Sequence, residues 1–119
     1  MAELPRIDPE AIENLRSLNP GDNDEFLREI IGIFLEDTPQ RIAELETGLA
    51  AADTPAFARA AHSIKGSSAN LGALRLKQIA EKIEHGSRQD GSGSAVADVA
   101  LLKTEFAATG AELGKFLKP

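Results

Sequence analysis

The chain has 119 residues, a length that suits one domain, and a formal net charge of −6 at pH 7. This acidic balance and the lack of a basic stripe argue against nucleic-acid binding, because contacts to phosphates need clustered Lys and Arg. No apolar run approaches the ~18 residues of a membrane span, the N-terminus does not resemble a secretion signal, and the absence of cysteine excludes disulfides and thiolate zinc sites. We therefore expect a cytoplasmic protein of one domain, residues 1–119.

Hydrophobic residues make up 42% of the chain, and its five aromatic residues are all Phe. Leucine, isoleucine and alanine must therefore fill most of the core, which favours helices over sheets. The first predicted helix starts at Asp8-Pro9, an N-cap followed by a proline at the first helical position, and ends at the turn Asn19-Pro20-Gly21. Its short apolar face consists of Ile12, Leu15 and Leu18.

The second predicted helix opens at Asp22-Asn23-Asp24-Glu25, where Asp22 has capping-box spacing to Glu25. Its apolar stripe repeats at steps of three and four, the helical period, through Ile31, Phe34 or Leu35, Thr38, Ile42, Leu45 and Leu49. An interior proline costs roughly 3 kcal/mol. Because the stripe keeps its phase across Pro39, we expect one long kinked helix here rather than two.

The third predicted helix starts at Thr54-Pro55, again a cap followed by proline, and ends before Gly72. Its core stripe consists of Phe57, Ala61, Ile64, Ser68 and Leu71. The fourth is expected from about Leu74 to His85 with Gly86 just beyond its end, and with Leu76, Ile79, Ala80 and Ile83 inward.

Residues 86–94 form a predicted flexible loop, GSRQDGSGS, before the last helix. That helix carries an apolar stripe at Val99, Leu102, Phe106, Thr109, Leu113 and Phe116. Long amphipathic helices joined by short turns bury their stripes against one another. The fold class is therefore predicted to be all-α, an antiparallel up-and-down four-helix bundle with a short extra N-terminal helix.

One face of the third helix is not explained by packing. On a wheel of 3.6 residues per turn, His62 points roughly 130° away from the core stripe, and Lys65 lies roughly 60° around from it. An exposed histidine or lysine is common on a helix surface. Gly66, one turn beyond His62, is less so, because a mid-helix glycine costs roughly 1 kcal/mol against alanine. It makes sense where a partner must approach the backbone closely.

An ordinary imidazole has a pKa near ~6.5, so it is largely neutral at cytoplasmic pH and can act as a nucleophile toward phosphorus. Phosphoryl transfer also needs the charge on the phosphoryl oxygens to be cancelled, which Lys65 can do. The sequence shows no Gly-rich nucleotide loop. A phosphoryl group on His62 must therefore come from another protein.

The segment AHSIKGSSANLGALRL, Ala61–Leu76, closely resembles the signature of histidine-containing phosphotransfer (HPt) domains of bacterial and fungal multistep phosphorelays. That signature reads His-x-x-Lys-Gly-Ser/Ala followed by a Leu-Gly pair. The resemblance extends over nearly the whole chain. A weaker one is to the phosphoacceptor domain of chemotaxis-type histidine kinases, which shares His-x-x-Lys-Gly but is normally fused to an ATP-binding domain.

The resemblance implies a role for each residue of the motif. His62 would accept the phosphoryl group through Nε2, Lys65 would neutralise its oxygens, and Gly66 would admit the loops of a receiver domain. Ser67 would help to fix the helix or contact the receiver. A Gln or Glu on the following helix commonly holds the other ring nitrogen, and counting along the chain gives Glu84; a solvated surface carboxylate is the alternative.

The resemblance also implies partners: response-regulator receiver domains and a hybrid histidine kinase, with Mg²⁺ on the receiver and no cofactor or metal on this chain. The protein would be a cytoplasmic, bacterial carrier and not an enzyme with its own ATP site. Exposed apolar residues of the first two helices are candidates for docking, although bundle core is the favoured interpretation for most of them: Ile7, Ile12, Phe26, Ile30 and Ile33.

Other readings stay open. The chain could be an adaptor bundle whose histidine is not phosphorylated, a phosphoacceptor domain excised from a chemotaxis-type kinase, or a stand-alone hydrolase, for which no second catalytic group is found. His85 is interpreted as a helix C-terminal residue favoured by the dipole. Each stripe can be buried within one bundle, so we expect a monomer, and Met1 with coherent caps favours a free-standing protein.

Overall fold

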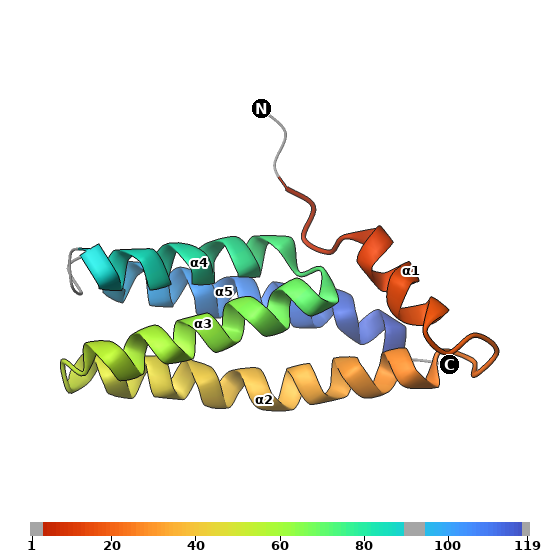
Figure 1. Cartoon of the computed structure of the whole chain (residues 1–119), viewed down its shortest axis with the longest axis horizontal. Coiled ribbons are helices and arrows are strands. Elements are labelled where there is room, and N and C mark those ends of the chain that lie inside the picture. The colour runs from red at the N-terminus through yellow and green to blue at the C-terminus, as the bar shows by residue number, and fades with distance from the viewer. Residues whose placement is uncertain (1–3, 90–94, 118–119) are drawn as a thin grey trace.

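A computed structural model describes residues 4–89 and 95–117 of the chain. In chain order its helices are α1 (Pro9–Ser17), α2 (Glu25–Ala50), α3 (Thr54–Leu71), α4 (Leu74–Gln89) and α5 (Ala95–Gly114), followed by the 3₁₀ turn η1 (Lys115–Leu117). Helices α2 to α5 run alternately in opposite directions, and α1 lies across one end of the bundle (Figure 1). The predicted all-α antiparallel four-helix bundle with a short N-terminal helix is confirmed.

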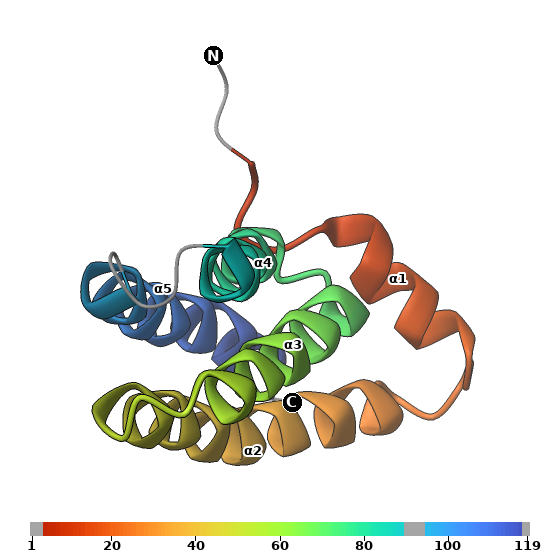
Figure 2. The same ribbon diagram turned by 60° about the vertical axis from the view of Figure 1, so that its left-hand side comes forward.

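The bundle closes around one core. Helices α2 and α4 each pack against both α3 and α5, so that the four form a ring, as the turned view shows (Figure 2). The predicted stripes supply most of its fully buried side chains, which include Ile31, Leu45, Ile64, Leu71, Leu76, Leu102 and Leu113. Leu35, Leu49, Ile79, Phe106 and Phe116 pack against this core but stay partly exposed.

Helix α2 is continuous through Pro39, as the phase of its stripe predicts. Pro39 is exposed, while Thr38 and Ile42 are buried. The cost of the proline is therefore met by the core contacts of a helix of 26 residues, long enough to place residues on both sides of Pro39 in the same core. This continuity gives α3 one long partner to pack against.

Two predicted capping residues and one apolar position differ from the structure, although α2 begins within the predicted opening and α3 begins at Thr54 as predicted. Helix α2 is preceded by Asp24 in the left-handed region at φ 63°, and Asp22 instead accepts a hydrogen bond from the backbone N–H of Phe26 at 3.0 Å. Helix α3 is capped by Asp53, one residue before the predicted Thr54. Leu18 lies just past the end of α1, so its side chain is 69% exposed instead of belonging to the apolar face.

Helix α4 is longer than predicted and continues through Gly86 to Gln89. Helix propensity at Gly86 is poor, but a single glycine costs only about 1 kcal/mol, and the upstream part of the helix is anchored by buried Leu76, Ala80 and Ile83. The predicted loop at residues 86–94 is thus helical in its first part, and its remainder, residues 90–94, lies outside the described residues.

The turn between α3 and α4 is a left-handed cap at Gly72. Its φ is +73°, and the N–H of Ala73 donates to the carbonyl of Ser68 at 2.8 Å, the bond that defines a Schellman ending. The N-terminal segment is joined to this turn by backbone hydrogen bonds, from Asp8 to Gly72 at 2.8 Å and from Leu74 to Arg6 at 3.1 Å. The turn therefore fixes both the start of α4 and the position of α1.

Arg6 ties the same segment to the last long helix. Its Nε lies 2.7 Å from Oε2 of Glu105, and the hydroxyl of the buried Thr109 donates to that oxygen at 3.0 Å. Glu112 adds a second carboxylate at 3.4 Å. These contacts link residues 99 and 106 positions apart in the chain, and they close the end of the bundle on which α1 lies.

Candidate functional site

His62 lies near the middle of α3, on the side of the helix that faces away from the core. Its neighbours Ala61 and Ile64 are buried, whereas the side chain of His62 is 66% exposed. The helical period produces this arrangement, because residues of the core stripe recur every three to four positions and His62 lies between them. The ring is accessible to a partner molecule.

The imidazole is held from the next helix by Glu84. Oε2 of Glu84 lies 2.9 Å from Nδ1 of His62, and Oε1 lies 2.8 Å from Nζ of Lys65. Glu84 itself is only 2% exposed. One buried carboxylate on α4 thus binds both His62 and Lys65 of the α3 motif. Glu84 lies beside the ring, where the resemblance placed it.

This contact determines which ring nitrogen carries the proton. An ionised carboxylate only accepts hydrogen bonds, so the nitrogen that faces it, Nδ1, must be the donor. In the neutral ring the proton is then on Nδ1, and Nε2 keeps a free lone pair. The arrangement leaves the exposed ring with its nucleophilic nitrogen directed away from the carboxylate.

Glu84 is ionised in spite of its burial. Burial raises the pKa of its carboxyl, but the hydrogen bonds from Lys65 and His62 lower it by more, and the net pKa lies below its ordinary value of 4.5. Hydrogen bonds to the charged form of an acid favour that form. The carboxylate therefore carries its negative charge throughout the neutral pH range.

The three small residues after Lys65 have different surroundings. Gly66 is exposed, and no atom lies within 4 Å of the place a Cβ would occupy. Ser67 is half-buried on the side of α3 that faces α2, and Ser68 is fully buried with an Oγ that finds no hydrogen-bond partner in the described part of the chain. Packing within the bundle explains Ser68, but it does not explain a glycine at position 66.

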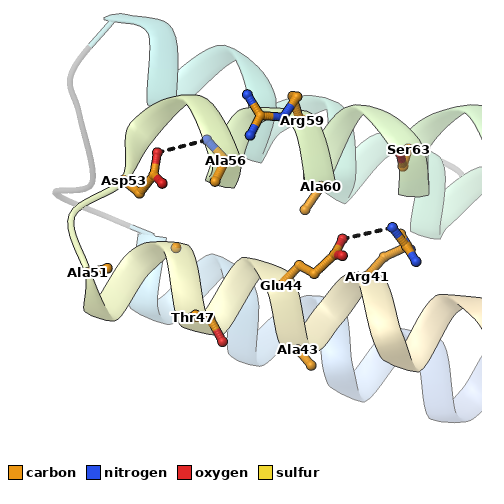
Figure 3. A pocket seen from close by; sticks show the side chains of 11 residues that line it. Arg41, Ala43, Glu44, Thr47, Ala51, Asp53, Ala56, Arg59, Ala60 and Ser63 are labelled. Carbon is orange, nitrogen blue, oxygen red and sulfur yellow. Dashed lines mark hydrogen bonds and ion pairs between the residues drawn. The ribbon is translucent and has the colours of Figure 1, made fainter.

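Two depressions follow the line where α2 and α3 meet, on the side of His62 opposite to Glu84. The apolar hollow has a volume of about 130 Å³ and is lined by Ile30, Ile33, Phe34, Asp37, Ser67, Asn70 and Leu71. The Arg41 groove, about 520 Å³, lies toward the N-terminus of α3, with Arg41, Glu44, Ala60 and Ser63 among its lining residues (Figure 3). In that groove Arg41 is paired with Glu44 at 2.9 Å.

The docking candidates are not equivalent. Ile33 is 55% exposed beside the apolar hollow, whereas Ile12 is buried at 2%. Ile7, Phe26 and Ile30 are partly buried and pack against the core. Core packing thus accounts for most of the set, and Ile33 stands out as the exposed member.

The segment of the chain that carries His62 is basic although the whole chain is acidic. Residues 54–80 contain four basic side chains and no Asp or Glu, while the whole chain has a net charge of −6. The basic residues are Arg59, Lys65, Arg75 and Lys77. His85 is also exposed but lies within α4, 3.9 Å from Glu81, so it is not at the end of the helix as predicted.

Within residues 4–89 and 95–117, no group of three or more His, Asp or Glu side chains is placed to hold a metal ion. In the same residues, no helix combines the length and the apolar character that crossing a bilayer requires.

The sequence reasoning named apolar candidates on α2, among them Ile30 and Ile33, but it missed the polar residues of this face. Asn70 and Asp37 line the apolar hollow, and Arg41 lines the groove next to Ser63. Asn70 lies eight residues after His62, a spacing that keeps it within about 80° of the histidine on the helical wheel and could have revealed it. Nothing in the sequence indicated which part of α2 faces α3.

Comparison with known proteins agrees with this architecture. The family model of the Hpt domain matches residues 29–112, well over half of the chain, and the chain therefore belongs to the Hpt domain family. It is 31% identical over 79 residues to multistep phosphorelay regulator 1 of Schizosaccharomyces pombe, an alignment covering 66% of this chain and 27% of that protein. The chain thus spans about a quarter of the length of that relative.

Two solved structures have the same fold. Histidine-containing phosphotransfer protein B (HptB) of Pseudomonas aeruginosa PAO1 superimposes with a TM-score of 0.85, 26% identity and 95% coverage of each chain. Histidine-containing phosphotransfer protein ZmHP2 of maize has a TM-score of 0.81, with 94% of this chain and 83% of that one covered. At 23% identity the maize protein shows the fold alone. By family and by fold, the chain is thus a histidine-containing phosphotransfer domain.

Proposed function

We propose that this chain is a phosphoryl carrier of multistep phosphorelays, that His62 is its phosphoacceptor and that Nε2 forms the bond to phosphorus. The observation that carries the proposal is the contact of Nδ1 with the buried carboxylate of Glu84 at 2.9 Å, on a side chain that is 66% exposed. It leaves Nε2 unprotonated and accessible, the two properties that a nitrogen nucleophile needs.

The phosphoryl group would come from the phosphoaspartate of one receiver domain and pass to the aspartate of another. In the first step the lone pair of Nε2 forms the N–P bond, and the acyl P–O bond breaks with its electrons on the departing aspartate carboxylate. In the second step an aspartate oxygen of the next receiver forms a P–O bond, and the electrons of the N–P bond return to Nε2. The proton on Nδ1 stays in place in both steps.

Lys65 supports both steps by charge. Its ammonium lies against Glu84 beside the ring, with a side chain that is 27% exposed. A cation next to the transferred group offsets the charge on its equatorial oxygens. Mg²⁺, which would offset the rest, is proposed to be carried by the receiver domain.

Docking is proposed to occur over Gly66 and the apolar hollow. The open space beside Gly66 allows a loop of the partner to approach the backbone of α3. Ile33 offers an exposed apolar contact at the rim of the hollow, and the positive charges of residues 54–80 complement an acidic phosphoaspartate site. A hybrid histidine kinase and a response regulator are the partners this predicts.

The absence of a nucleotide-binding loop in the sequence supports a role without an ATP site. Such a carrier works in the compartment of its receivers, and we propose the cytoplasm and a monomeric state.

The test is transfer of labelled phosphate from a phosphorylated receiver domain to the full chain. We expect acid-labile, base-stable labelling that disappears in His62→Gln and persists in His85→Gln, which removes the other histidine of the chain. Labelling that survives His62→Gln would show that the acceptor is assigned wrongly. Binding of a receiver without any labelling of the unsubstituted chain would favour the adaptor hypothesis.

A further inference from the structure

Phosphorylation changes the charge of the ring that contacts Glu84. Attack by the neutral imidazole forms the N–P bond with both electrons from Nε2, while Nδ1 keeps its hydrogen. The phosphorylated ring is therefore a cation at first. Its Nδ1–H still points at Oε2 of Glu84, which is 2.9 Å away in the unphosphorylated structure.

The fate of that hydrogen determines how easily the N–P bond breaks. If Nδ1 keeps it, the group that leaves phosphorus is a neutral imidazole. If Nδ1 loses it, the leaving group is an imidazolate anion, which is a far stronger base and leaves slowly. Any feature of the protein that retains the proton on Nδ1 therefore keeps the phosphoryl group transferable.

We propose, on the basis of the proposed function, that Glu84 is a positioning residue that retains the Nδ1 proton on phosphorylated His62 and so keeps its phosphoryl group ready for transfer at neutral pH. A buried carboxylate is suited to this, because an opposite charge within about 4–6 Å strongly favours the cationic ring. Burial at 2% exposure limits the screening of this charge by water.

Lys65 keeps this carboxylate available as an anion. Its Nζ lies 2.8 Å from Oε1, the oxygen that does not face the ring. The hydrogen bonds of Lys65 and His62 outweigh the effect of burial and lower the pKa of Glu84. The carboxylate is thus ionised when the ring becomes cationic, and it does not need to give up a proton first.

Other charged groups near His62 lie on all three helices that form this face. Within residues 4–89 and 95–117, the carboxylate of Glu84 is the group with a hydrogen bond to the imidazole. Further charged or titratable residues on these helices include Arg59 and Lys65 on α3, Lys77, Glu81 and His85 on α4, and Asp37, Arg41 and Glu44 on α2. Their contributions are common to the chain and to a variant at Glu84, so a comparison of the two isolates the effect of this carboxylate.

The experiment measures the hydrolysis rate of the phosphorylated protein as a function of pH, for the unsubstituted chain and for Glu84→Gln. Glutamine keeps an oxygen that can accept from Nδ1–H but removes the charge. Water attacks phosphorus, the N–P electrons return to Nε2, and the rate reports the fraction of rings with a protonated Nδ1. We expect the pH at which the rate falls to half to be lower in Glu84→Gln by about one to three units.

Glu81→Gln is the matched control. Glu81 lies three residues before Glu84 on α4, its side chain is 47% exposed, and it pairs with His85 at 3.9 Å. The substitution removes the same charge from the same helix. The pH midpoint of Glu81→Gln should therefore equal that of the unsubstituted chain. Equal midpoints in the unsubstituted chain and in Glu84→Gln, or an equal shift in Glu81→Gln, would overturn the inference.

A second measurement needs no variant. In ¹⁵N NMR spectra of the phosphorylated chain at pH 7 we expect a protonated Nδ1 on His62, and an unprotonated Nδ1 would overturn the inference even if Glu84→Gln failed to fold. Failure here is distinct from failure of the proposed function. A chain labelled on His62 with an unprotonated Nδ1 contradicts only this inference, whereas a chain not labelled on His62 contradicts the proposed function.

Discussion

The ammonium of Lys65 lies 2.8 Å from the carboxylate of Glu84, nineteen residues further along the chain on the facing helix. The same carboxylate binds Nδ1 of His62 at 2.9 Å. Lys65, which is expected to offset the charge of the phosphoryl group, is thus also the partner of a buried acid. Its substitution should affect both stability and transfer.

The first prediction concerns this double role. Lys65→Met leaves the Glu84 carboxylate buried with one hydrogen-bond donor fewer, so we expect the free energy of unfolding to fall by about 1–3 kcal/mol. The rate of phosphotransfer should fall as well, because a charge is lost beside the transferred group. Urea unfolding and receiver-to-carrier transfer rates measure the two effects. Lys77→Met, a substitution of the same kind on α4, should change neither by a comparable amount.

The second prediction compares two glycines. At Gly66 an added Cβ meets no atom within 4 Å, so Gly66→Ala should raise the stability of the isolated chain by up to about 1 kcal/mol. It should nevertheless slow transfer, because the methyl group stands where the receiver approaches. At Gly72, with φ at +73°, a Cβ would lie 2.5 Å from Cβ of Ala11.

Gly72→Ala should therefore lower the thermal midpoint, in contrast to Gly66→Ala, since an alanine at positive φ is strained and here also clashes. Thermal unfolding followed by circular dichroism, together with transfer rates, checks both variants. A Gly66→Ala protein that is more stable and transfers at the original rate would remove the reason for a glycine on this face.

The third prediction tests the docking surface. Ile33 and Leu101 are similarly exposed, at 55% and 50%, but only Ile33 borders the apolar hollow beside Ser67 and Asn70. Ile33→Ser should raise the receiver concentration needed for half-maximal transfer by about tenfold. This factor corresponds to the loss of one buried apolar contact of about 1.5 kcal/mol. Leu101→Ser on α5 should leave it unchanged, and both variants should keep the stability of the unsubstituted chain. Equal effects of the two substitutions would place docking elsewhere.

The fourth prediction follows from the lowered pKa of Glu84. Because this carboxyl is more acidic in the folded chain than its ordinary value of 4.5, the unfolded chain binds its proton first as the pH falls. Its contribution to stability is therefore complete at neutral pH and is lost below about pH 4.5. Relative to Glu84→Gln, the unsubstituted chain should lose free energy of unfolding on acidification from pH 5 to pH 3. Urea titrations at a series of pH values measure this, and a gain on acidification would contradict it.

Short-range signals in the sequence account for most of the fold. The phase of the stripe across Pro39 predicted one helix, and Gly72 predicted the end of α3, because both depend on neighbours within a few residues. The choice between Asp22 and Asp24, or between Asp53 and Thr54, could not be made in this way. Several acceptors in a row can cap the same helix, and tertiary contacts decide which one does.

The candidate site was predictable to the extent that one helix carries it. The outward direction of His62 and the neighbouring Lys65 follow from the helical period. Glu84 was reached by a resemblance, and the structure adds what the resemblance lacked, namely that its carboxylate is buried and shared with Lys65. Ile33 could not be distinguished from Ile30, because the rotation of α2 against α3 is set by packing over the whole interface.

The link between Arg6 and Glu105 joins positions 99 residues apart. During synthesis the N-terminal segment leaves the ribosome first and must wait for its acidic partner until α5 has emerged. The backbone bonds from Asp8 to Gly72 and from Leu74 to Arg6 need only the first three helices and the start of the fourth. The segment is thus anchored in two stages, first on the turn at Gly72 and last on α5. A nascent chain stopped before Glu105 therefore contains the helix of His62 but lacks the contact that closes the end of the bundle.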